Sequence, residues 1–496
     1  MGLLANYREV LDTPARRQVM LALCSTFLLV QVASFPVALA LPSIAEDFLI
    51  DVETAAWVLV AELLALGATV YLAAKLGDRY GHSRIFFFGI VITTLGAVAA
   101  GFAMDFTQLL VFRGVQGLGA ALVTGNANAI LAGNFAAEER GRAFAVPITA
   151  ARFGTFAGLI AFAIFLQWLG WRFIFFSFIP LGVVAIWSGL PLFRQKDDPD
   201  VDRAGPVDFG GAFLFIGMIA ALILSGLHLH SGEESFTSAD AISYHLPMHV
   251  LTVVLLVAFI FYERWVKQPF VDLRQFKNRH FSLALFSNTT FHLSMLAIMT
   301  LVPILVEKGF GYGPLFVIYV LLPHQSMGLF IPIVAGWYYD RYHPRLLRPI
   351  AMSMIALGIF LVGMFALKVP FWFMPLLLFP ASIGTSIFNT INNAVIMNSI
   401  GQEQRGFASG MIETTRQVGH TLGATVAASA LGLVLPAGIA LLSEAEAREF
   451  YFRGLQGSAL VVVWIILAGA LVAFNHRVLP TTPKKVATQP SGAGRG

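Results

Sequence analysis

Long apolar runs constrain this 496-residue sequence more than any other feature. A helix of about 17 or more apolar residues is long enough to cross the hydrocarbon core of a bilayer. We expect fourteen such spans, near residues 18–41, 54–74, 85–103, 107–132, 143–166, 172–193, 208–229, 247–262, 281–304, 314–338, 349–367, 372–397, 407–435 and 454–474. Since 57% of the residues are hydrophobic and only 12% are charged, a water-soluble fold could not cover its surface. The sequence predicts an all-α polytopic membrane protein.

The distribution of basic residues predicts the orientation of these spans. With the N-terminus in the cytoplasm, 24 of the 32 Lys and Arg residues fall in cytoplasmic segments, five fall in outer loops and three lie within spans. This bias follows the positive-inside rule, so both termini are expected in the cytoplasm and the chain in the inner (plasma) membrane. The tail 480–496 is expected to be disordered and cytoplasmic.

Composition also argues against other classes of protein. The net charge is only +4 and the basic residues are scattered, so no nucleic-acid partner is expected. Cys24 is the single cysteine, which excludes an intrachain disulfide. The chain has no P-loop, HExxH or GxSxG motif, so ATP-driven transport and the standard hydrolases are disfavoured, and we expect no cofactor and no metal.

Two charged phrases occur twice, each time at an offset of eight spans. Ala73–Arg84 (AAKLGDRYGHSR) corresponds to Gly336–Arg345 (GWYYDRYHPR), since both carry Asp-Arg-Tyr followed by another arginine. Glu138–Gly141 (EERG) corresponds to Glu403–Gly406 (EQRG). Two motif pairs at one common offset indicate an internal repeat of six-helix units. The predicted domains are an N-terminal bundle (1–193), two extra spans with linkers (194–280) and a C-terminal bundle (281–479).

The first repeated phrase carries charges of both signs beside helix ends. We interpret its charged residues as a cytoplasmic latch that holds one conformation and releases in the other. The alternative is that they are solvated loop charges. The latch residues are Asp78, Arg79 and Arg84 in the first unit and Asp340, Arg341 and Arg345 in the second.

Five ionisable side chains other than histidine lie within predicted spans: Glu62, Arg113, Arg152, Glu413 and Arg416. Each costs roughly 2.5 to 3.5 kcal/mol at mid-bilayer, so each should face a cavity or a partner. Glu62 and Arg113 lie at similar depths and can meet. The hypothesis is that Glu62 is a protonatable carboxylate whose proton affinity Arg113 controls; the alternative is a permanent structural ion pair.

Glu413 lies three residues before Arg416 and can pair with it along one helix face. Arg152 then has no obvious acidic partner. An arginine without a carboxylate suits an anionic substrate, although Arg152 could instead bond helix carbonyls or a lipid phosphate.

Neutral polar residues and histidines also fall within spans. The further candidates for lining a substrate cavity are Asn126, Asn288, Gln325, Asn389, Asn392 and Asn393. For Asn389, Asn392 and Asn393, which share one helical face, the alternative is hydrogen bonding between helices. His292 and His324 are candidates for carrying a proton, although a single histidine is more often structural. The small-residue spacings Gly154–Gly158 and Gly419–Gly423 predict close helix packing.

Several motifs together resemble the major facilitator superfamily, in particular its 14-helix drug:proton antiporters, over essentially the whole chain. Ala74–Arg84 resembles the signature of loop 2–3, with Ala74 in place of its first glycine, and Arg113–Gly117 (RGVQG) resembles that of helix 4. Gly170–Phe175 is similar to the start of helix 6, Pro269–Phe281 to loop 8–9 and Gly406–Gly423 to helix 13. The resemblance implies a major facilitator fold of 14 transmembrane helices, arranged 6+2+6 with two pseudo-symmetric bundles.

The resemblance also implies a function, from which the sequence departs at two places. Ala33 occupies the position of the family's helix 1 aspartate, and Gly154 is followed by Thr155 where the helix 5 antiporter signature has Gly-Pro. The leading expectation is proton-coupled efflux of small amphipathic compounds by alternating access. The alternatives are a transporter of an anionic, carboxylate-bearing metabolite and a non-transporting membrane sensor or scaffold.

The expected partners follow from this interpretation. They are a small-molecule substrate, the proton and the lipid bilayer. The chain is expected to be a monomer, and no sequence feature supports a periplasmic adaptor.

Overall fold

The computed structural model describes residues 3–34, 37, 40–50, 52–194, 207–226, 239–436 and 439–475. Within these residues every regular element is a helix and no strand occurs. The predicted tail 480–496 and most of the linkers around the two extra spans lie outside the described residues.

The helices follow the predicted spans closely. The first group is α1 (Leu3–Val10), α2 (Pro14–Ser34), α3 (Leu41–Phe48), α4 (Val52–Ala55), α5 (Trp57–Tyr80), α6 (His82–Gly101), α7 (Phe106–Asn134), α8 (Arg140–Trp168), α9 (Arg172–Phe176) and α10 (Phe178–Phe193). The middle pair is α11 (Phe209–Ser225) and α12 (Ala239–Trp265). The last group is α13 (Arg279–Ile304), α14 (Pro314–Ser326), α15 (Ile331–Tyr342), α16 (Leu347–Phe365), α17 (Met374–Asn398), α18 (Arg405–Gly432) and α19 (Glu444–Asn475).

Eleven stretches of the described chain are long and apolar enough to cross a membrane. The predicted count of fourteen is not reached by this criterion. Apolar α11 is shorter, at 17 residues, and neither α2 nor α18 is among the eleven. The chain is nevertheless a polytopic helical membrane protein, as predicted.

Local signals explain where several helices begin. The Asp105 carboxylate accepts a hydrogen bond from the backbone N–H of Gln108 (2.8 Å) and so caps α7. Asp208 caps α11 and Asn278 caps α13 in the same way. Both repeated phrases contain a residue with positive φ directly after a helix, Gly81 (φ 96°) after α5 and His343 (φ 45°) after α15. Glycine adopts a positive φ at no steric cost, and histidine is one of the non-glycine residues that are enriched there.

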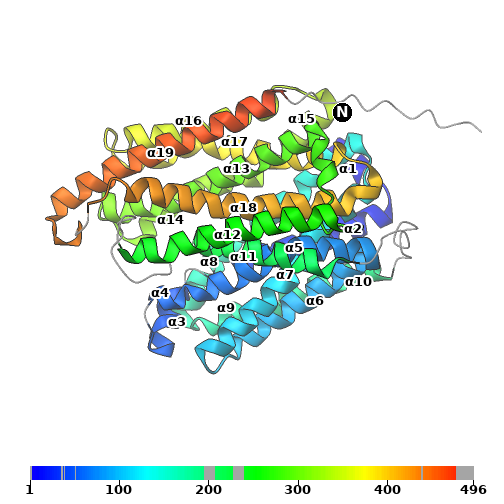
Figure 1. Ribbon diagram of the computed structural model, residues 1–496, viewed down its shortest axis with the longest axis horizontal. Helices are drawn as coiled ribbons and strands as arrows, with labels where there is room; N and C mark the ends of the chain where they lie inside the picture. Colours follow the sequence, from blue (N-terminus) through cyan, green and yellow to red (C-terminus); the bar gives the residue numbers. More distant parts are fainter. Residues whose placement is uncertain are drawn as a thin grey trace, which may run out of the picture.

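Buried apolar side chains form two main clusters. One lies wholly within α13–α19 and their short connections. The other is built from α1–α12 and is joined by residues near one end of α13, α15, α17 and α18. In Figure 1 α13–α19 lie in the upper half of the picture and most of the first group lies in the lower half, with α11 and α12 between them. The two helix groups therefore pack against each other at one end of the molecule.

We call this the closed end. It contains the end of α5 and α15, the start of α8 and α18, and residues 78–84, 137–142, 340–345 and 402–406. Two helix crossings join the groups there, α8 with α15 and α5 with α18. A Cβ on Gly336 would lie 2.4 Å from the Gly141 carbonyl oxygen, and one on Gly410 would lie 2.9 Å from the Ala74 Cβ. The two crossings use positions that correspond in the sequence repeat.

The short helix α1 reinforces the closed end. The Tyr7 hydroxyl donates to the backbone carbonyl of Ile333 in α15 (2.6 Å), and Glu9 pairs with Arg142 of α8 (3.7 Å). Burial, with a smaller effect of Asp340, raises the pKa of the Tyr7 hydroxyl, so it remains a hydrogen-bond donor at neutral pH. The stabilisation from this hydrogen bond is fully present below the ordinary tyrosine pKa of about 10. It is lost as the pH rises through the raised pKa of Tyr7 in the folded protein.

Candidate functional site

A central cavity of about 370 Å³ lies between the two helix groups. Its walls come from α2, α5, α7 and α8 on one side and from α13, α14, α17 and α18 on the other, with a contribution from α11. Most of the lining is apolar, including Phe27, Phe144, Phe291, Met295 and Met299. The volume is in the range of small-molecule binding pockets.

Four of the five predicted intramembrane charges line this cavity. They are Glu62, Arg152, Glu413 and Arg416, and they come from three helices, α5, α8 and α18. The fifth, Arg113, lies directly behind Glu62. Because both helix groups contribute charge, a change in their relative position would alter the cavity's electrostatics.

Glu62 and Arg113 form a fully buried ion pair across α5 and α7. Arg113 donates to the Glu62 carboxylate, to the Val58 carbonyl (3.0 Å) and to the Gln116 side chain (2.7 Å), and its guanidinium lies over the Phe175 ring. The Glu62 carboxylate keeps one oxygen, Oε1, without a hydrogen-bond partner. The pair predicted from similar depth is thus in contact, and its acidic member lines the cavity.

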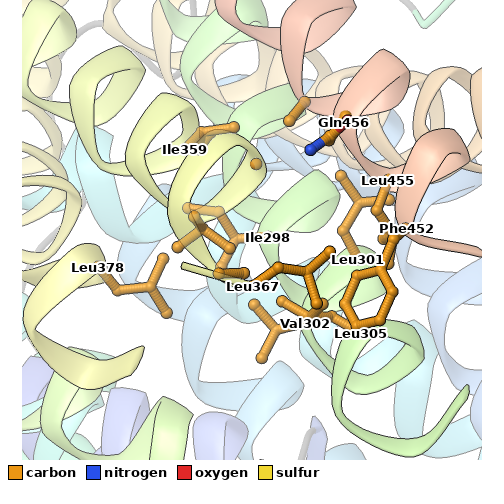
Figure 2. Close-up of a pocket in the computed structure, with 14 residues that line it drawn as sticks. Ile298, Leu301, Val302, Leu305, Ile359, Leu367, Leu378, Phe452, Leu455 and Gln456 are labelled. Atoms are coloured by element: carbon orange, nitrogen blue, oxygen red, sulfur yellow. The ribbon is translucent and has the colours of Figure 1, made fainter. Parts of the chain in front are cut away.

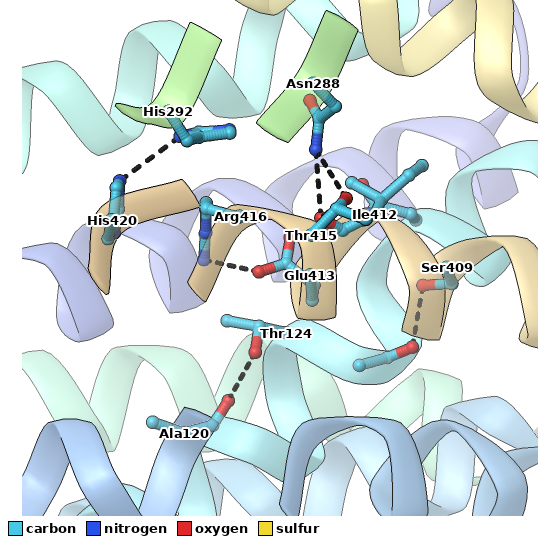
Figure 3. A network of polar contacts seen from close by, with 12 residues as sticks. Ala120, Thr124, Asn288, His292, Ser409, Ile412, Glu413, Thr415, Arg416 and His420 are labelled. Carbon is cyan, nitrogen blue, oxygen red and sulfur yellow. Dashed lines mark hydrogen bonds and ion pairs between the residues drawn. The ribbon is translucent and has the colours of Figure 1, made fainter. Parts of the chain in front are cut away.

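Glu413 and Arg416 form the second pair, along one face of α18. Their charged atoms lie 2.5 Å apart, and a dashed line joins the two side chains in Figure 3. Both residues line the cavity. Asn128 of α7 donates to Glu413 Oε1 over 3.4 Å, a long contact between the two helix groups. Unlike the Glu62–Arg113 pair, this one keeps an exposed guanidinium, since the Arg416 side chain is 23% exposed.

Two histidines meet in the cavity wall. His292 Nδ1 of α13 lies 3.2 Å from His420 Nε2 of α18, as Figure 3 shows. Gly419 permits this approach, because a Cβ there would lie 2.6 Å from the Thr289 carbonyl oxygen and 2.8 Å from the His292 Cβ. Sequence reasoning missed His420; its position one turn after Arg416 on the same face of α18 was the available signal.

Arg152 projects into the cavity from α8. One of its guanidinium nitrogens donates to the Gln325 side-chain oxygen of α14. Within the described part of the chain no carboxylate lies within ion-pair distance of Arg152, in agreement with the absence of a partner in the sequence. This arginine therefore bridges the two helix groups through a neutral amide.

Asn389 and Asn393, one turn apart on α17, line the cavity, but Asn392 does not. Asn392 Nδ2 donates to Asn288 (3.2 Å), and Asn392 Oδ1 accepts from Arg348 (2.6 Å). Asn288 in turn donates to Thr415 and to the Ile412 carbonyl of α18 (Figure 3). The prediction that Asn288 and Asn392 line the cavity is therefore wrong, because both side chains form hydrogen bonds between helices instead.

Two other predicted residues also lie outside the cavity lining. Asn126 contacts the His82 ring (2.7 Å) and donates to the Ala73 carbonyl (3.0 Å), so it joins α7 to α5 and α6. His324 contacts the Ser382 hydroxyl of α17 (2.8 Å) and is 4% exposed. Both side chains have hydrogen-bond partners inside the protein, and neither residue lines the cavity.

The predicted small-residue contacts occur at three of the four glycines. A Cβ on Gly154 would lie 2.9 Å from the Leu28 carbonyl oxygen of α2, and one on Gly423 would lie 2.3 Å from that of Leu293 in α13. Gly419 makes the contact described above. Gly158 is buried in α8.

At the closed end the predicted acidic residues contact the other helix group. Asp340 of α15 accepts hydrogen bonds from the backbone N–H groups of Gly141 (2.8 Å) and Arg142 (2.9 Å) at the start of α8, and from Arg142 Nε (3.0 Å). Asp78 of α5 lies against the start of α18, where a Cβ on Gly406 would be 1.8 Å from its carboxylate, and it also meets His82 (3.4 Å). A carboxylate at a helix N-terminus is electrostatically favourable.

The predicted latch arginines are placed differently. Arg79 lies over the ring of Tyr80, and Arg341 lies near the rings of Trp337 and Tyr342, within their own helices. Arg345 is exposed, and so is Arg84, which lies in the first turn of α6. Arg142 and Arg140 of α8 do reach the other helix group, and Arg140 donates to the Met397 carbonyl (3.1 Å) and to Asn398 (2.6 Å) of α17. Sequence reasoning used Arg140 to align the repeat but missed this contact.

Comparison with known proteins assigns the family. A family model described as Major Facilitator Superfamily matches residues 21–424. The chain belongs to the major facilitator superfamily. It is therefore a membrane transporter and not an enzyme.

Curated relatives are similar over most of their length. The chain is 26% identical over 389 residues to the riboflavin transporter RibZ of Clostridioides difficile, covering 78% of this chain and 81% of that protein. It is 27% identical over 402 residues to the multidrug resistance protein Stp of Mycobacterium tuberculosis (81% and 73%), and 23% identical over 421 residues to multidrug resistance protein 3 of Bacillus subtilis (84% and 80%). The relatives thus include proteins named for multidrug resistance, as the resemblance implied.

Solved structures support the fold. The proton:xylose symporter XylE aligns with a TM-score of 0.61 at 12% identity, over 92% of this chain and 94% of that one. The human organic anion transporter MFSD10 aligns with a TM-score of 0.56 at 14% identity, over 93% of this chain and 100% of that one. At these identities the likeness shows the fold alone.

Proposed function

We propose that the protein is a secondary active exporter of small amphipathic compounds, driven by proton antiport across the inner membrane. The observation that carries the proposal is the central cavity, whose apolar walls and charged groups come from both helix groups. The relatives named for multidrug resistance support efflux. Alternating access would expose this cavity to each side of the membrane in turn.

The proposal includes a specific topology. Adding α2, α11 and α18 to the eleven stretches that satisfy length and hydropathy gives fourteen spans arranged 6+2+6. The bundles would be 1–193 and 281–479 with two extra spans between them, and both termini would be cytoplasmic. The closed end is then the cytoplasmic end, and the described conformation is the one sealed toward the cytoplasm. We propose that Asp78 and Asp340 act as its latches, and that the transporter functions as a monomer.

Glu62 is the proposed proton-coupling residue. Its carboxylate lines the cavity, keeps one oxygen unpartnered and is held by Arg113. While the pair is intact Arg113 favours the charged carboxylate, and separation of the pair would let Glu62 take up a proton. Glu413 and His292, which also line the cavity, are the secondary candidates.

The test is transport by Glu62→Gln in proteoliposomes, against a panel of cationic, neutral and anionic compounds with and without a pH gradient. We expect flux to lose its dependence on the pH gradient, because an amide cannot exchange a proton at this site. Glu263→Gln is the matched control, since Glu263 is also a buried carboxyl but lies in α12, away from the cavity. If efflux by Glu62→Gln remains proton-driven, the role of Glu62 is wrong.

A further inference from the structure

The charges that face the central cavity do not balance. Glu62 is committed to Arg113 and Glu413 to Arg416, so each carboxylate already has a cation. Arg152 is the remaining charged group of the lining, and its partner is the neutral side chain of Gln325. With the described residues alone, the cavity carries one cation that no protein carboxylate neutralises.

The protein holds this cation firmly in place. Gly328, in the short turn between α14 and α15, lies against the aliphatic part of Arg152, since a Cβ there would be 2.8 Å from its Cγ. The amide oxygen of Gln325 fixes one guanidinium nitrogen. No hydrogen bond within the described chain occupies the other two nitrogens, so Arg152 can present them to a bound group. A guanidinium with two free nitrogens matches the geometry of a carboxylate.

The neighbouring polar groups of the lining suit an anion too. Asn389, Asn393 and Gln417 offer amide N–H donors, and Arg416 presents part of its guanidinium. The remainder of the wall is apolar and aromatic. A charged head at Arg152 and a hydrophobic body against these side chains would satisfy both parts of the cavity.

We propose that the preferred substrate of this site is an amphipathic compound that carries one carboxylate, which binds Arg152. This inference rests on the proposed function, because it names the substrate class of the same cavity. A lipid phosphate offers similar chemistry to Arg152, so the experiment has to separate the two sources of the anion.

The experiment compares a matched pair of probes, 2-naphthylacetate and its neutral amide, in binding to the purified full-length protein in liposomes. The wild-type protein is expected to bind the acid at least tenfold more tightly than the amide. In Gln325→Glu the new carboxylate pairs with Arg152 and so takes the place of the substrate's carboxylate. The acid should then bind about as tightly as the amide, while binding of the amide is retained. Gln31→Glu is the matched control: it adds the same charge to the cavity wall from α2, and it should keep most of the preference.

A second variant and a change of lipid complete the test. Arg152→Gln should also remove the preference for the acid, and size-exclusion chromatography of each variant checks that it is folded. Liposomes of phosphatidylcholine alone, whose phosphate is balanced by its own choline, and liposomes containing net-anionic phosphatidylglycerol should give the same preference. The proposal is overturned if the wild-type protein binds acid and amide equally, or if Gln325→Glu and Arg152→Gln keep the preference for the acid. It is also overturned if the wild-type protein prefers the acid only in liposomes without phosphatidylglycerol.

Binding and flux separate this inference from the proposed function. A preference for the acid without flux driven by a pH gradient would reject proton-coupled export and leave the substrate class standing. Proton-driven flux of the amide and of cationic compounds, without preference for the acid, would support proton-coupled export and reject the proposed substrate class.

Discussion

Two cavities in the described part of the chain differ in position and in lining. The central cavity of about 370 Å³ lies between the two helix groups and has charged and amide side chains from both. The second, of about 30 Å³, lies within one group, between α13, α16, α17 and α19, and Gln456 is the one polar side chain among the residues that line it (Figure 2). Its volume is about that of one water molecule. The large, polar cavity thus lies at the boundary between the two helix groups, whereas the small, apolar one lies inside a single group.

The largest expected effect comes from preventing the two groups from meeting at the closed end. In Gly336→Ala the new Cβ would lie 2.4 Å from the Gly141 carbonyl oxygen, a backbone atom that cannot move independently. Overpacking of this kind costs about 1 to 3 kcal/mol, so we expect transport in proteoliposomes to fall roughly 5- to 150-fold. Gly114→Ala is the matched control, because a Cβ there meets no atom within 4 Å. Equal activity of the two variants would show that the crossing of α8 and α15 is not needed.

A smaller effect is expected from filling the central cavity. Ala424 of α18 lines it, so Ala424→Phe would occupy space that a substrate needs. We expect the Kd for a bound substrate to rise about tenfold, with thermal stability little changed, because the phenyl ring enters an existing space. Unchanged affinity together with unchanged stability would mean that substrate binds elsewhere.

The smallest effect is expected in the apolar cavity. Val302→Ile adds one methylene group to its wall and should stabilise the protein by about 0.8 kcal/mol, a rise in Tm of about 1 °C. Transport should be unchanged, because this cavity lies within one helix group. A change in substrate affinity in this variant would contradict the distinction between the two cavities.

Apolar run length predicted the helices well, because each span must satisfy its own backbone hydrogen bonds in lipid. The predicted span 107–132 became α7 (Phe106–Asn134), and 281–304 became α13 (Arg279–Ile304). Two charge contacts were also predictable, because Glu62–Arg113 and Glu413–Arg416 follow from depth and from helical spacing.

The errors arose where a helix presents polar residues to two neighbours. Helix α17 carries three asparagines close together, Asn389, Asn392 and Asn393. Their spacing alone does not tell which of them face the cavity and which contacts α13. Arg348 donates a hydrogen bond to Asn392 and so holds this side chain away from the cavity, but the predicted spans place Arg348 in a loop. In the structure it lies in the first turn of α16, is 4% exposed and stacks on Phe388. Pairing between distant helices, as with His292 and His420, needs the tertiary structure.

The most direct measurement is reversible cross-linking of the two groups at the closed end. In a Cys24→Ser background, Arg142→Cys and Asp340→Cys replace a pair whose side chains lie 3.0 Å apart. A short bifunctional methanethiosulfonate would join them, and flux is measured before linking, after linking and after reduction. We predict that linking reduces flux to background and that reduction restores it, because the central cavity must open at this end in each cycle. A linked protein that transports at the unlinked rate would contradict alternating access between the two helix groups.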